Sequence, residues 1–190
     1  MILVIYAHPY PRRSRASRHL LEAILDLPGL AVHSIYERYP DFDIDIPGEQ
    51  AALNQAQLVV WLHPLYWYSP PGLMKHWFDK VLAYGWAYGP NGHALRGKHC
   101  LWAPTTGGDE HAYSTTGMHE HPFNSFVLPV EETARFCGMH WEPPHIVHGA
   151  HLISNEVLDA QAQAFRQRLL SWSAQHGVAP VSSTASEVAP

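Results

Sequence analysis

The sequence predicts an α/β fold in which a doubly wound, five-stranded parallel sheet carries helices on both faces. The chain of 190 residues has the length of one domain with a full hydrophobic core, and its 46% hydrophobic and 15% charged residues are typical of globular proteins. Short apolar, β-prone runs recur along the chain, and segments with the apolar spacing of helices separate them. Such alternation indicates parallel strands joined by crossover helices.

Five apolar runs are predicted to be strands. They are residues 2–7 (ILVIYA), 30–36 (LAVHSIY), 57–62 (QLVVWL), 99–104 (HCLWAP) and 140–149 (HWEPPHIVHG). Strands of a parallel sheet are buried on both faces, so they read as nearly continuous apolar runs. With right-handed crossovers, we expect the flavodoxin-like arrangement, in which the strand order is 2-1-3-4-5.

Five further segments are predicted to be helices. They are residues 14–27, 48–56, 70–82, 129–138 and 154–172. Ser14 or Ser17 is the expected N-cap of the first helix, and Ser154 or Asn155 that of the last. Gly138 is expected to end the fourth helix, because glycine adopts the left-handed conformation that follows many helices.

Composition narrows the classes of function and the expected location. The net charge of -5 argues against a general nucleic-acid binder, which needs a basic face. No apolar run approaches the ~20 residues of a membrane span, and the first residues lack the pattern of a signal peptide. Cys100 and Cys137 lie in apolar segments and are expected to be free, buried thiols, which favours the cytoplasm. We expect one domain over residues 1–176 and a flexible tail over 177–190.

In sheets of this topology, ligands bind beyond the carboxyl ends of the strands, where the winding reverses. The loop after the first strand, HPYPRRSRAS (8–17), leads into a helix N-terminus, where free N–H groups favour an anion. Ser14 and Ser17 add hydroxyl donors, so a phosphate site is one interpretation and a capped helix with a solvated basic turn is the other. The glycine patterns of P-loops and dinucleotide-binding loops are absent.

Two more loops are expected at the same edge. HPLYWYSPPGL (63–73) places Tyr66, Trp67 and Tyr68 in a loop, where binding of a planar aromatic ligand is more plausible than core packing. TTGG (105–108) brings a backbone that can approach a ligand closely, and Tyr113 and His119 follow as titratable hydrogen-bond donors. A phosphate end, an aromatic wall and an amide cradle together suit flavin mononucleotide (FMN).

Several stretches also resemble a known family. HPYPRRSRAS, HPLYWYSPPGLMKHWFDKVL, GWAYG, TTGG, YSTTGMH and FCGMHWEPP, in this order, resemble the flavin-dependent NAD(P)H:quinone oxidoreductases of flavodoxin-like fold. Within that family the sequence is most similar to the bacterial ancillary subunits of glutathione-regulated potassium-efflux systems. The resemblance runs from residue 1 to about residue 176.

The resemblance implies a set of site residues. Cofactor contacts are implied at His8, Ser14, Arg15, Ala16, Ser17, Leu65, Tyr66, Trp67, Tyr68, Thr105, Thr106, Gly107 and Gly108. Tyr113 and His119 match the Tyr and His that line the site beside the flavin and hydrogen-bond the quinone. The chain departs from the family at Ser17, where Asn is frequent, and at Tyr66, where Gln or a similar residue is frequent.

The resemblance also implies a reaction and partners. The expected cofactor is FMN, with FAD as the alternative, and a ping-pong reaction passes a hydride from NAD(P)H through the flavin to a quinone or related electrophile. A homodimer is implied whose active site the partner chain completes. The alternative function is that of a regulatory ancillary subunit of a potassium-efflux transporter, cytoplasmic and peripheral at the inner membrane, with secondary redox activity.

Three other functions fit the sequence less well. A flavodoxin-type electron carrier usually has a strongly acidic surface, whereas this chain has 17 acidic and 12 basic residues. A low-molecular-weight phosphatase needs a Cys followed by an Arg in a phosphate loop, which neither cysteine segment supplies. The chain has 15 histidines, but His111, His119 and His121, with Glu110 and Glu120, match no standard zinc spacing, so no metal is expected.

Overall fold

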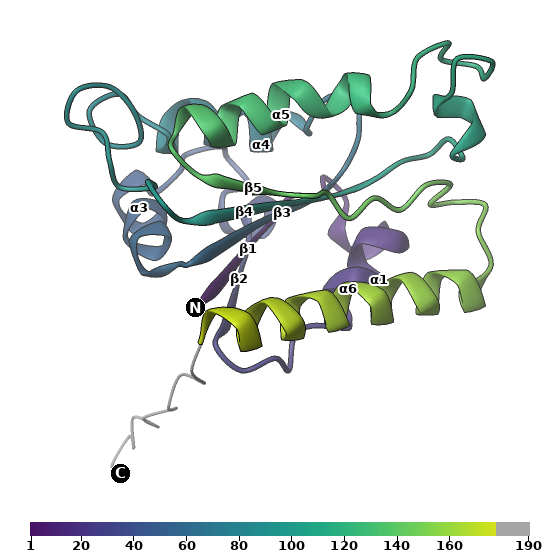
Figure 1. The fold of residues 1–190 in the computed structure, drawn as a ribbon, viewed down its shortest axis with the longest axis horizontal. Helices are drawn as coiled ribbons and strands as arrows, with labels where there is room; N and C mark the ends of the chain where they lie inside the picture. Colours follow the sequence, from purple (N-terminus) through teal and green to yellow (C-terminus); the bar gives the residue numbers. More distant parts are fainter. Residues whose placement is uncertain (178–190) are drawn as a thin grey trace.

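The computed structural model describes residues 1–177 and contains one five-stranded sheet between two layers of helices (Figure 1). Its strands are β1 (Ile2–Tyr6), β2 (Leu30–Ser34), β3 (Leu58–Pro64), β4 (His99–Thr105) and β5 (His140–Glu142). All neighbouring strands are parallel and their order is β2-β1-β3-β4-β5. The predicted fold class and strand order are therefore confirmed. Apart from Gly177, the predicted tail lies outside the described residues.

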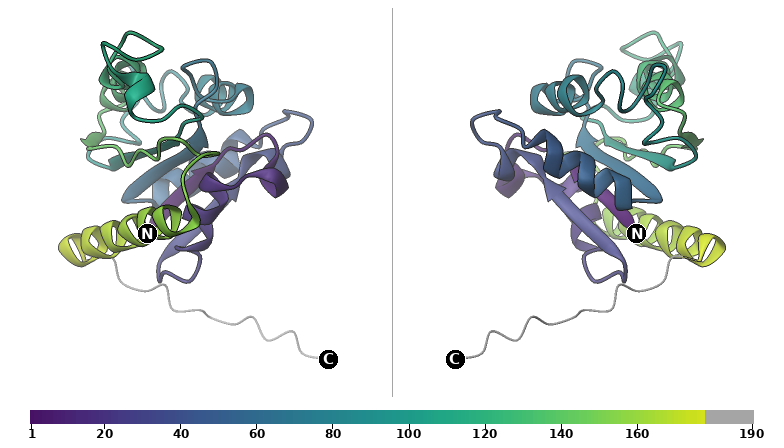
Figure 2. Two further views of the ribbon diagram at one scale, coloured as in Figure 1. Left: turned by 90° about the vertical axis from the view of Figure 1, so that its right-hand side faces the viewer. Right: turned by 90° about the vertical axis from the view of Figure 1, so that its left-hand side faces the viewer.

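Six α-helices and two short 3-10 helices connect and follow the strands. They are η1 (Pro11–Arg13), α1 (Ala16–Glu22), α2 (Ile35–Arg38), α3 (Ile46–Gln55), α4 (Gly72–Val81), η2 (His111–Tyr113), α5 (Asn124–Phe136) and α6 (Asn155–His176). Helices α1 and α6 cover one face of the sheet, while α4 and α5 lie on the other (Figures 1 and 2). Within the described residues, no helix is long and apolar enough to cross a membrane.

The core consists of two apolar layers, one on each face of the sheet. Alternation along β1 illustrates the division, because Val4 packs with α1 and α6 whereas Leu3 and Ile5 pack with α3, α4 and α5. Three tryptophans, Trp61, Trp77 and Trp102, are almost completely buried in the second layer. Their bulk fixes the spacing between the sheet and the helices that carry the loops at its carboxyl edge.

Three elements differ most in length from the sequence predictions. β5 ends at Glu142 instead of residue 149, because Pro143 and Pro144 have no N–H group to continue the ladder. α5 begins at Asn124, five residues before the predicted start, and contains Pro129. The first helix, predicted over residues 14–27, is regular only over Ala16–Glu22.

The helix ends agree in part with the predicted caps. Ser154 caps α6, since its Oγ accepts a hydrogen bond from the Val157 N–H at 3.3 Å. Gly138 follows α5 with a φ of +76°, as its position in the sequence predicted. At α1 the capping residue is Arg15, although Ser14 Oγ still accepts from the Arg18 N–H at 3.1 Å.

Candidate functional site

The carboxyl ends of β1, β3 and β4 open onto a cavity of about 330 Å³. Residues from all three predicted loops line it, together with Ala150 and His151 from the segment after β5. Every predicted cofactor contact lines this cavity except Trp67, Tyr68 and Gly108. Three separated stretches of sequence thus meet where the sheet topology places a ligand.

The first loop supplies unpaired backbone donors to the cavity. The N–H groups of Arg15, Ala16 and Ser17 have no hydrogen-bond partner within the described residues. The Arg15 guanidinium is already engaged, because it donates to the carbonyls of Ala150 (2.9 Å) and Ile153 (2.7 Å). Arg15 therefore ties the loop to the segment before α6, and its main chain is the part that is free to bind an anion.

Two side chains of the first loop have defined partners. Ser17 Oγ lies 2.9 Å from Thr105 Oγ1 in a buried hydrogen bond that joins the first loop to the third. His8 Nδ1 accepts from the Tyr10 N–H at 3.1 Å, which leaves the Nε2–H as the donor of the neutral ring. Burial lowers the pKa of His8, so the neutral ring is favoured near pH 7.

The second loop is a strained two-residue turn. Tyr66 and Ser69 exchange both backbone hydrogen bonds (2.9 and 3.0 Å), and the residues between them, Trp67 and Tyr68, have φ angles of +49° and +62°. Positive φ at both central positions is the pattern of a type I′ turn, which usually contains Asn and Gly. Each such non-glycine residue costs ~1–3 kcal/mol, and strain of this size clusters at functional sites.

The turn directs its side chains in different directions. Leu65 and Tyr66 line the cavity, Tyr68 faces His119, and the Trp67 side chain is 92% exposed. The N–H groups of Trp67 and Tyr68 have no partner among residues 1–177. Trp67 therefore offers its backbone, and not its ring, to a ligand in this single chain.

A buried histidine supports the second loop from below. His63 donates from Nδ1 to the Pro64 carbonyl (3.0 Å), and its Nε2 accepts from the Trp102 indole N–H (2.8 Å). Both ring nitrogens are thereby used, and burial lowers the pKa of His63 to about 4. The imidazole is neutral near pH 7 and holds the end of β3 in place. The sequence predictions missed this residue because it follows directly on an apolar run.

The third loop combines open space with close packing. A Cβ at Gly107 would meet no atom within 4 Å, so a side chain there would stand in the cavity. A Cβ at Gly108 would lie 3.1 Å from the Ala112 Cβ and 3.3 Å from the Tyr113 ring. The N–H groups of both glycines are unpaired within the described residues. The missing side chain of Gly107 therefore keeps the cavity open, and that of Gly108 allows the close contact with Tyr113.

Tyr113 and His119, the predicted catalytic pair, lie together beside this loop. Their ring centroids are 4.4 Å apart, and His119 Nδ1 lies 3.2 Å from the Tyr68 hydroxyl. Burial raises the pKa of the Tyr113 phenol, and the Thr106 hydroxyl opposes that shift. The pair does not line the cavity itself but contacts Gly108 at its rim.

The segment after β5 adds residues that the sequence predictions missed. His148 Nδ1 lies 3.0 Å from Thr106 Oγ1, and His151 lines the cavity. The strand predicted over residues 140–149 includes His148 and stops two residues before His151, so neither residue was predicted at the carboxyl edge. The Pro143-Pro144 pair was the available signal, because a proline pair interrupts a strand.

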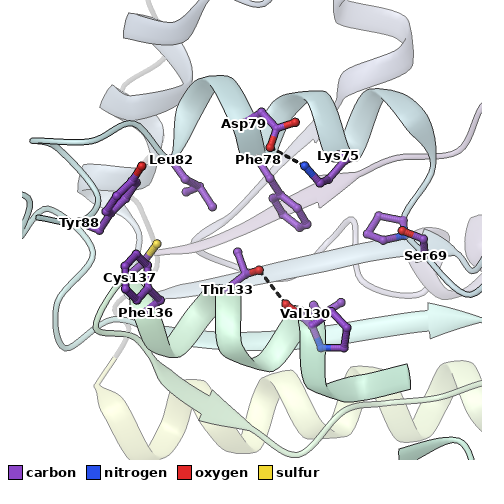
Figure 3. A pocket seen from close by; sticks show the side chains of 12 residues that line it. Ser69, Lys75, Phe78, Asp79, Leu82, Tyr88, Val130, Thr133, Phe136 and Cys137 are labelled. Carbon is purple, nitrogen blue, oxygen red and sulfur yellow. Dashed lines mark hydrogen bonds and ion pairs between the residues drawn. The ribbon is translucent and has the colours of Figure 1, made fainter. Parts of the chain in front are cut away.

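An apolar groove of about 430 Å³ lies between α4 and α5 (Figure 3). It extends from Ser69, directly after the strained turn, to Phe136, whose side chain is 71% exposed. Phe78, Leu82 and Val130 are among the apolar side chains that line it. Among residues 1–177, no group of three or more His, Cys, Asp and Glu side chains is arranged to hold a metal ion.

Comparison with known proteins agrees with this geometry. A family model described as flavodoxin-like fold matches residues 1–171. The chain belongs to this flavodoxin-like family. A curated relative, the glutathione-regulated potassium-efflux system ancillary protein KefF of Enterobacter sp. (strain 638), is 51% identical over 176 residues. The match covers 93% of this chain and 99% of the relative, which confirms the resemblance seen in the sequence.

Three solved structures superpose closely on this chain. A tryptophan halogenase from Streptomycin violaceusniger has a TM-score of 0.85 at 36% identity and covers 88% of this chain and 98% of its own. General stress protein 14 from Treponema denticola, in complex with FMN, has a TM-score of 0.81 at 30% identity, covering 94% and 99%. An NADPH-quinone reductase from P. pentosaceus has a TM-score of 0.80 at 27% identity, covering 88% and 96%.

Proposed function

We propose that this protein is an FMN-dependent NAD(P)H:quinone oxidoreductase. The observation that carries the proposal is the convergence of three loops with unpaired N–H groups on one cavity, with the Tyr113–His119 pair at its rim. The FMN complex and the NADPH-quinone reductase among the superposed structures support it. The halogenase has a different activity, and one fold hosts many functions, so the site and not the fold must decide.

The residues of the cavity fit FMN. Its volume lies within the range of about 300–1,000 Å³ that is usual for ligand pockets. The N–H groups of residues 15–17, with the exposed Arg13 beside them, would hold the phosphate, and Leu65 and Tyr66 would form one wall for the ring. When bound, the flavin would accept a hydride from NAD(P)H and pass it to the acceptor.

The chain contributes hydrogen-bond donors where negative charge develops. The N–H groups of Gly107 and Gly108 would stabilise that charge, at about 3 kcal/mol for each well-placed donor. If the Tyr68 hydroxyl donates to His119 Nδ1, then Nε2 carries the proton, and this nitrogen lies 3.6 Å from a Cβ built at Gly108. Tyr113 and His119 would therefore donate to the oxygen of a bound quinone.

We further propose that two copies of the chain form a homodimer that completes the site. The apolar groove between α4 and α5 begins beside the strained turn, and the exposed Trp67, Leu128 and Phe136 lie on the elements that border it. Exposed apolar surface of this kind commonly marks an interface. A partner chain seated on the groove would lie against the rim of the cofactor site.

A second candidate function is regulation of a potassium-efflux transporter. Its support is the relative named as an ancillary protein of such a system, whose match covers nearly the whole of both chains. The protein would then act at the membrane surface by binding the transporter, and the flavin site would serve it in addition. Co-purification with the transporter, and potassium efflux measured with and without this protein, would test this function.

The absorption spectrum of the purified protein tests the main proposal. We expect a yellow protein that releases FMN, identified by mass spectrometry, and oxidises NADH or NADPH when menadione is present. Gly107→Val should abolish FMN binding because its side chain would occupy the cavity, whereas Ala160→Val, at an exposed position of α6, should not. His119→Ala should retain FMN and lose quinone turnover. A colourless protein that cannot be reconstituted with flavin contradicts the proposal.

A further inference from the structure

A second cavity, of about 490 Å³, lies beside the TTGG loop. It shares no lining residue with the first cavity, which is the proposed cofactor site of about 330 Å³. His148 lines it, together with Asp109 and Glu110 and an apolar wall that includes Ile146 and Val157. The cavity therefore brings water to one side of His148 without passing through the proposed cofactor site.

His148 connects this cavity to Tyr113 through one hydroxyl group. Thr106 Oγ1 donates to the Gly108 carbonyl at 2.7 Å, so in its contact with His148 Nδ1 at 3.0 Å it must accept, and His148 carries its proton on Nδ1. Thr106 and Tyr113 meet at Gly108, because Thr106 Oγ1 bonds to the Gly108 carbonyl and the Tyr113 ring lies 3.3 Å from a Cβ built at Gly108. Burial raises the pKa of the Tyr113 phenol, and the Thr106 hydroxyl lowers it. The Tyr113 ring has two imidazoles as neighbours, with ring centroids 4.4 Å away for His119 and 5.4 Å away for His148.

We propose that His148 resupplies the proton that Tyr113 gives to the reduced acceptor, with Thr106 as the intermediate group and the second cavity as the source. The inference rests on the proposed quinone reductase function. A quinone that receives one hydride needs one proton to become a hydroquinone, and NAD(P)H supplies the hydride with both electrons. Only the proton must come from water.

The transfer balances at each atom. The O–H bond of Tyr113 breaks as its proton passes to the acceptor oxygen. The Thr106 hydroxyl turns away from the Gly108 carbonyl and gives its proton to Tyr113, and the His148 Nδ1 proton then replaces that of Thr106. A hydronium ion in the second cavity gives its proton to His148 Nε2 and becomes water, which leaves the ring neutral, and proton exchange with water restores the Nδ1–H form. No oxidant or reductant beyond NAD(P)H and the quinone takes part.

The surroundings of His148 suit this role. Burial lowers its pKa, and Glu110 and Asp109 oppose that shift, so the ring is neutral near pH 7 and the carboxylates favour its transient charged form. Tyr113 is the other titratable group in contact with the ring. From the α6 side the cavity adds only uncharged groups, Val157 and Gln161. A bound flavin and quinone would cover the first cavity, so a separate supply of protons is useful only on this side.

Two electron acceptors distinguish this relay from a structural role of His148. Menadione takes up a proton as it is reduced, whereas ferricyanide accepts one electron and no proton. His148→Ala should lower kcat with menadione by at least about tenfold, because a general acid typically contributes ~10²–10⁴-fold and water replaces part of a lost relay. The same variant should reduce ferricyanide at the rate of the unchanged protein. Added imidazole, which the second cavity can hold, should restore menadione turnover.

Matched variants complete the experiment. Gln161→Ala removes another polar side chain of the same cavity and should leave both activities unchanged. Thr106→Val should lower menadione turnover without rescue by imidazole, since the intermediate hydroxyl is then missing. Equal loss with both acceptors, or menadione turnover unchanged in His148→Ala, overturns the relay. If the unchanged protein binds no flavin or reduces neither acceptor, the proposed function itself fails, and the relay fails with it.

Discussion

His63 shows how one buried side chain can set the position of a site loop. Its imidazole is 0% exposed and lies between the Pro64 carbonyl and the Trp102 indole, with one hydrogen bond to each. Trp102 in turn stacks on Phe123, with ring centroids 5.8 Å apart. The Phe123 ring packs edge-on against the Tyr113 ring, with centroids 5.2 Å apart. The base of the second loop and the Tyr113–His119 pair are thus linked by one continuous set of buried rings.

The buried neutral state of His63 predicts a pH dependence of stability. Its pKa falls from 6.5 to about 4 on folding, so the unfolded chain binds more protons between these values. The contribution of the neutral His63 to the free energy of unfolding is complete above pH 6.5 and is lost as the pH falls towards 4. At 1.36 kcal/mol for each pKa unit, the loss amounts to about 3 kcal/mol. His63→Gln should therefore remove part of the decrease in unfolding free energy between pH 7 and pH 5, measured with urea.

A replacement at an exposed histidine is the control for this prediction. His93→Gln should show the same slope of stability against pH as the unchanged protein, because His93 is exposed. If His63→Gln also keeps that slope, the buried imidazole is not the group that titrates on unfolding.

Single residues of the site were predictable where the loop itself carries the chemistry. Gly107 and Tyr113 were proposed as site residues because glycine pairs, and titratable groups that follow a predicted strand, stand out in a sequence. The partners that position them, His63 and His148, were not found, because each acts through a contact between segments that are distant in the chain. Arg15 was predicted as a phosphate contact, and only the structure shows that its guanidinium is bonded to the segment before α6.

At the scale of elements, Glu49 joins four segments through one buried carboxylate. It lies on α3, is 0% exposed, and accepts from His33 of β2 (2.9 Å) and from Trp77 of α4 (2.9 Å). Tyr39, which follows α2, also donates to it at 2.6 Å. Burial alone would raise the pKa of Glu49, but these three hydrogen bonds lower it below the usual value. The carboxylate therefore holds α4, whose N-terminus follows the second loop, against the edge of the sheet.

Glu49→Gln should destabilise the protein by about 3 kcal/mol near pH 7. The substitution replaces one carboxylate oxygen, which accepts hydrogen bonds, with an NH₂ group that would face other buried donors. Unfolding in urea, followed by tryptophan fluorescence, measures this loss. Because the folded pKa is lowered, the stabilisation is complete above the model-peptide value of 4.5 and is lost as the pH falls below it. Glu22→Gln, which removes an exposed ion pair with Arg18, should cost less than ~1 kcal/mol. Similar losses in the two variants would contradict the role given to Glu49.

Helices and strands were predicted well where the apolar pattern extends over many residues, as in α6. They were predicted poorly where a local feature, such as a proline pair, ends the element. The strand predicted over residues 140–149 contains enough β-prone residues for a strand, yet the proline pair confines β5 to three residues. Val147 retains one isolated bridge to Thr105, so the segment still follows the end of β4 without forming a strand. This departure from regular structure is what places His148 and His151 at the site.

At the scale of the whole molecule, the sheet separates stability from function. The two apolar layers lie along the strands, while the three loops, the strained turn and both cavities flanking the TTGG loop lie at or near the carboxyl edge. Topology predicted this division from the order of the elements alone. Which surface a second chain would cover did not follow from that order, because the groove between α4 and α5 depends on how their side chains pack (Figure 3).

Trp67 provides a test of the proposed homodimer. In a single chain the residue has an unfavourable φ of +49°, while its ring is 92% exposed and gains almost no burial. A second chain that covers the ring would offset this cost by burying it. Trp67→Asn, which suits the left-handed conformation, should stabilise the isolated chain by ~1 kcal/mol and weaken self-association. Sedimentation equilibrium and urea unfolding at low protein concentration measure the two effects.

Leu25→Asn, at an exposed position after α1, is the control and should change neither self-association nor the φ strain of the turn. A Trp67→Asn protein that dimerises as tightly as the unchanged chain would place the interface elsewhere.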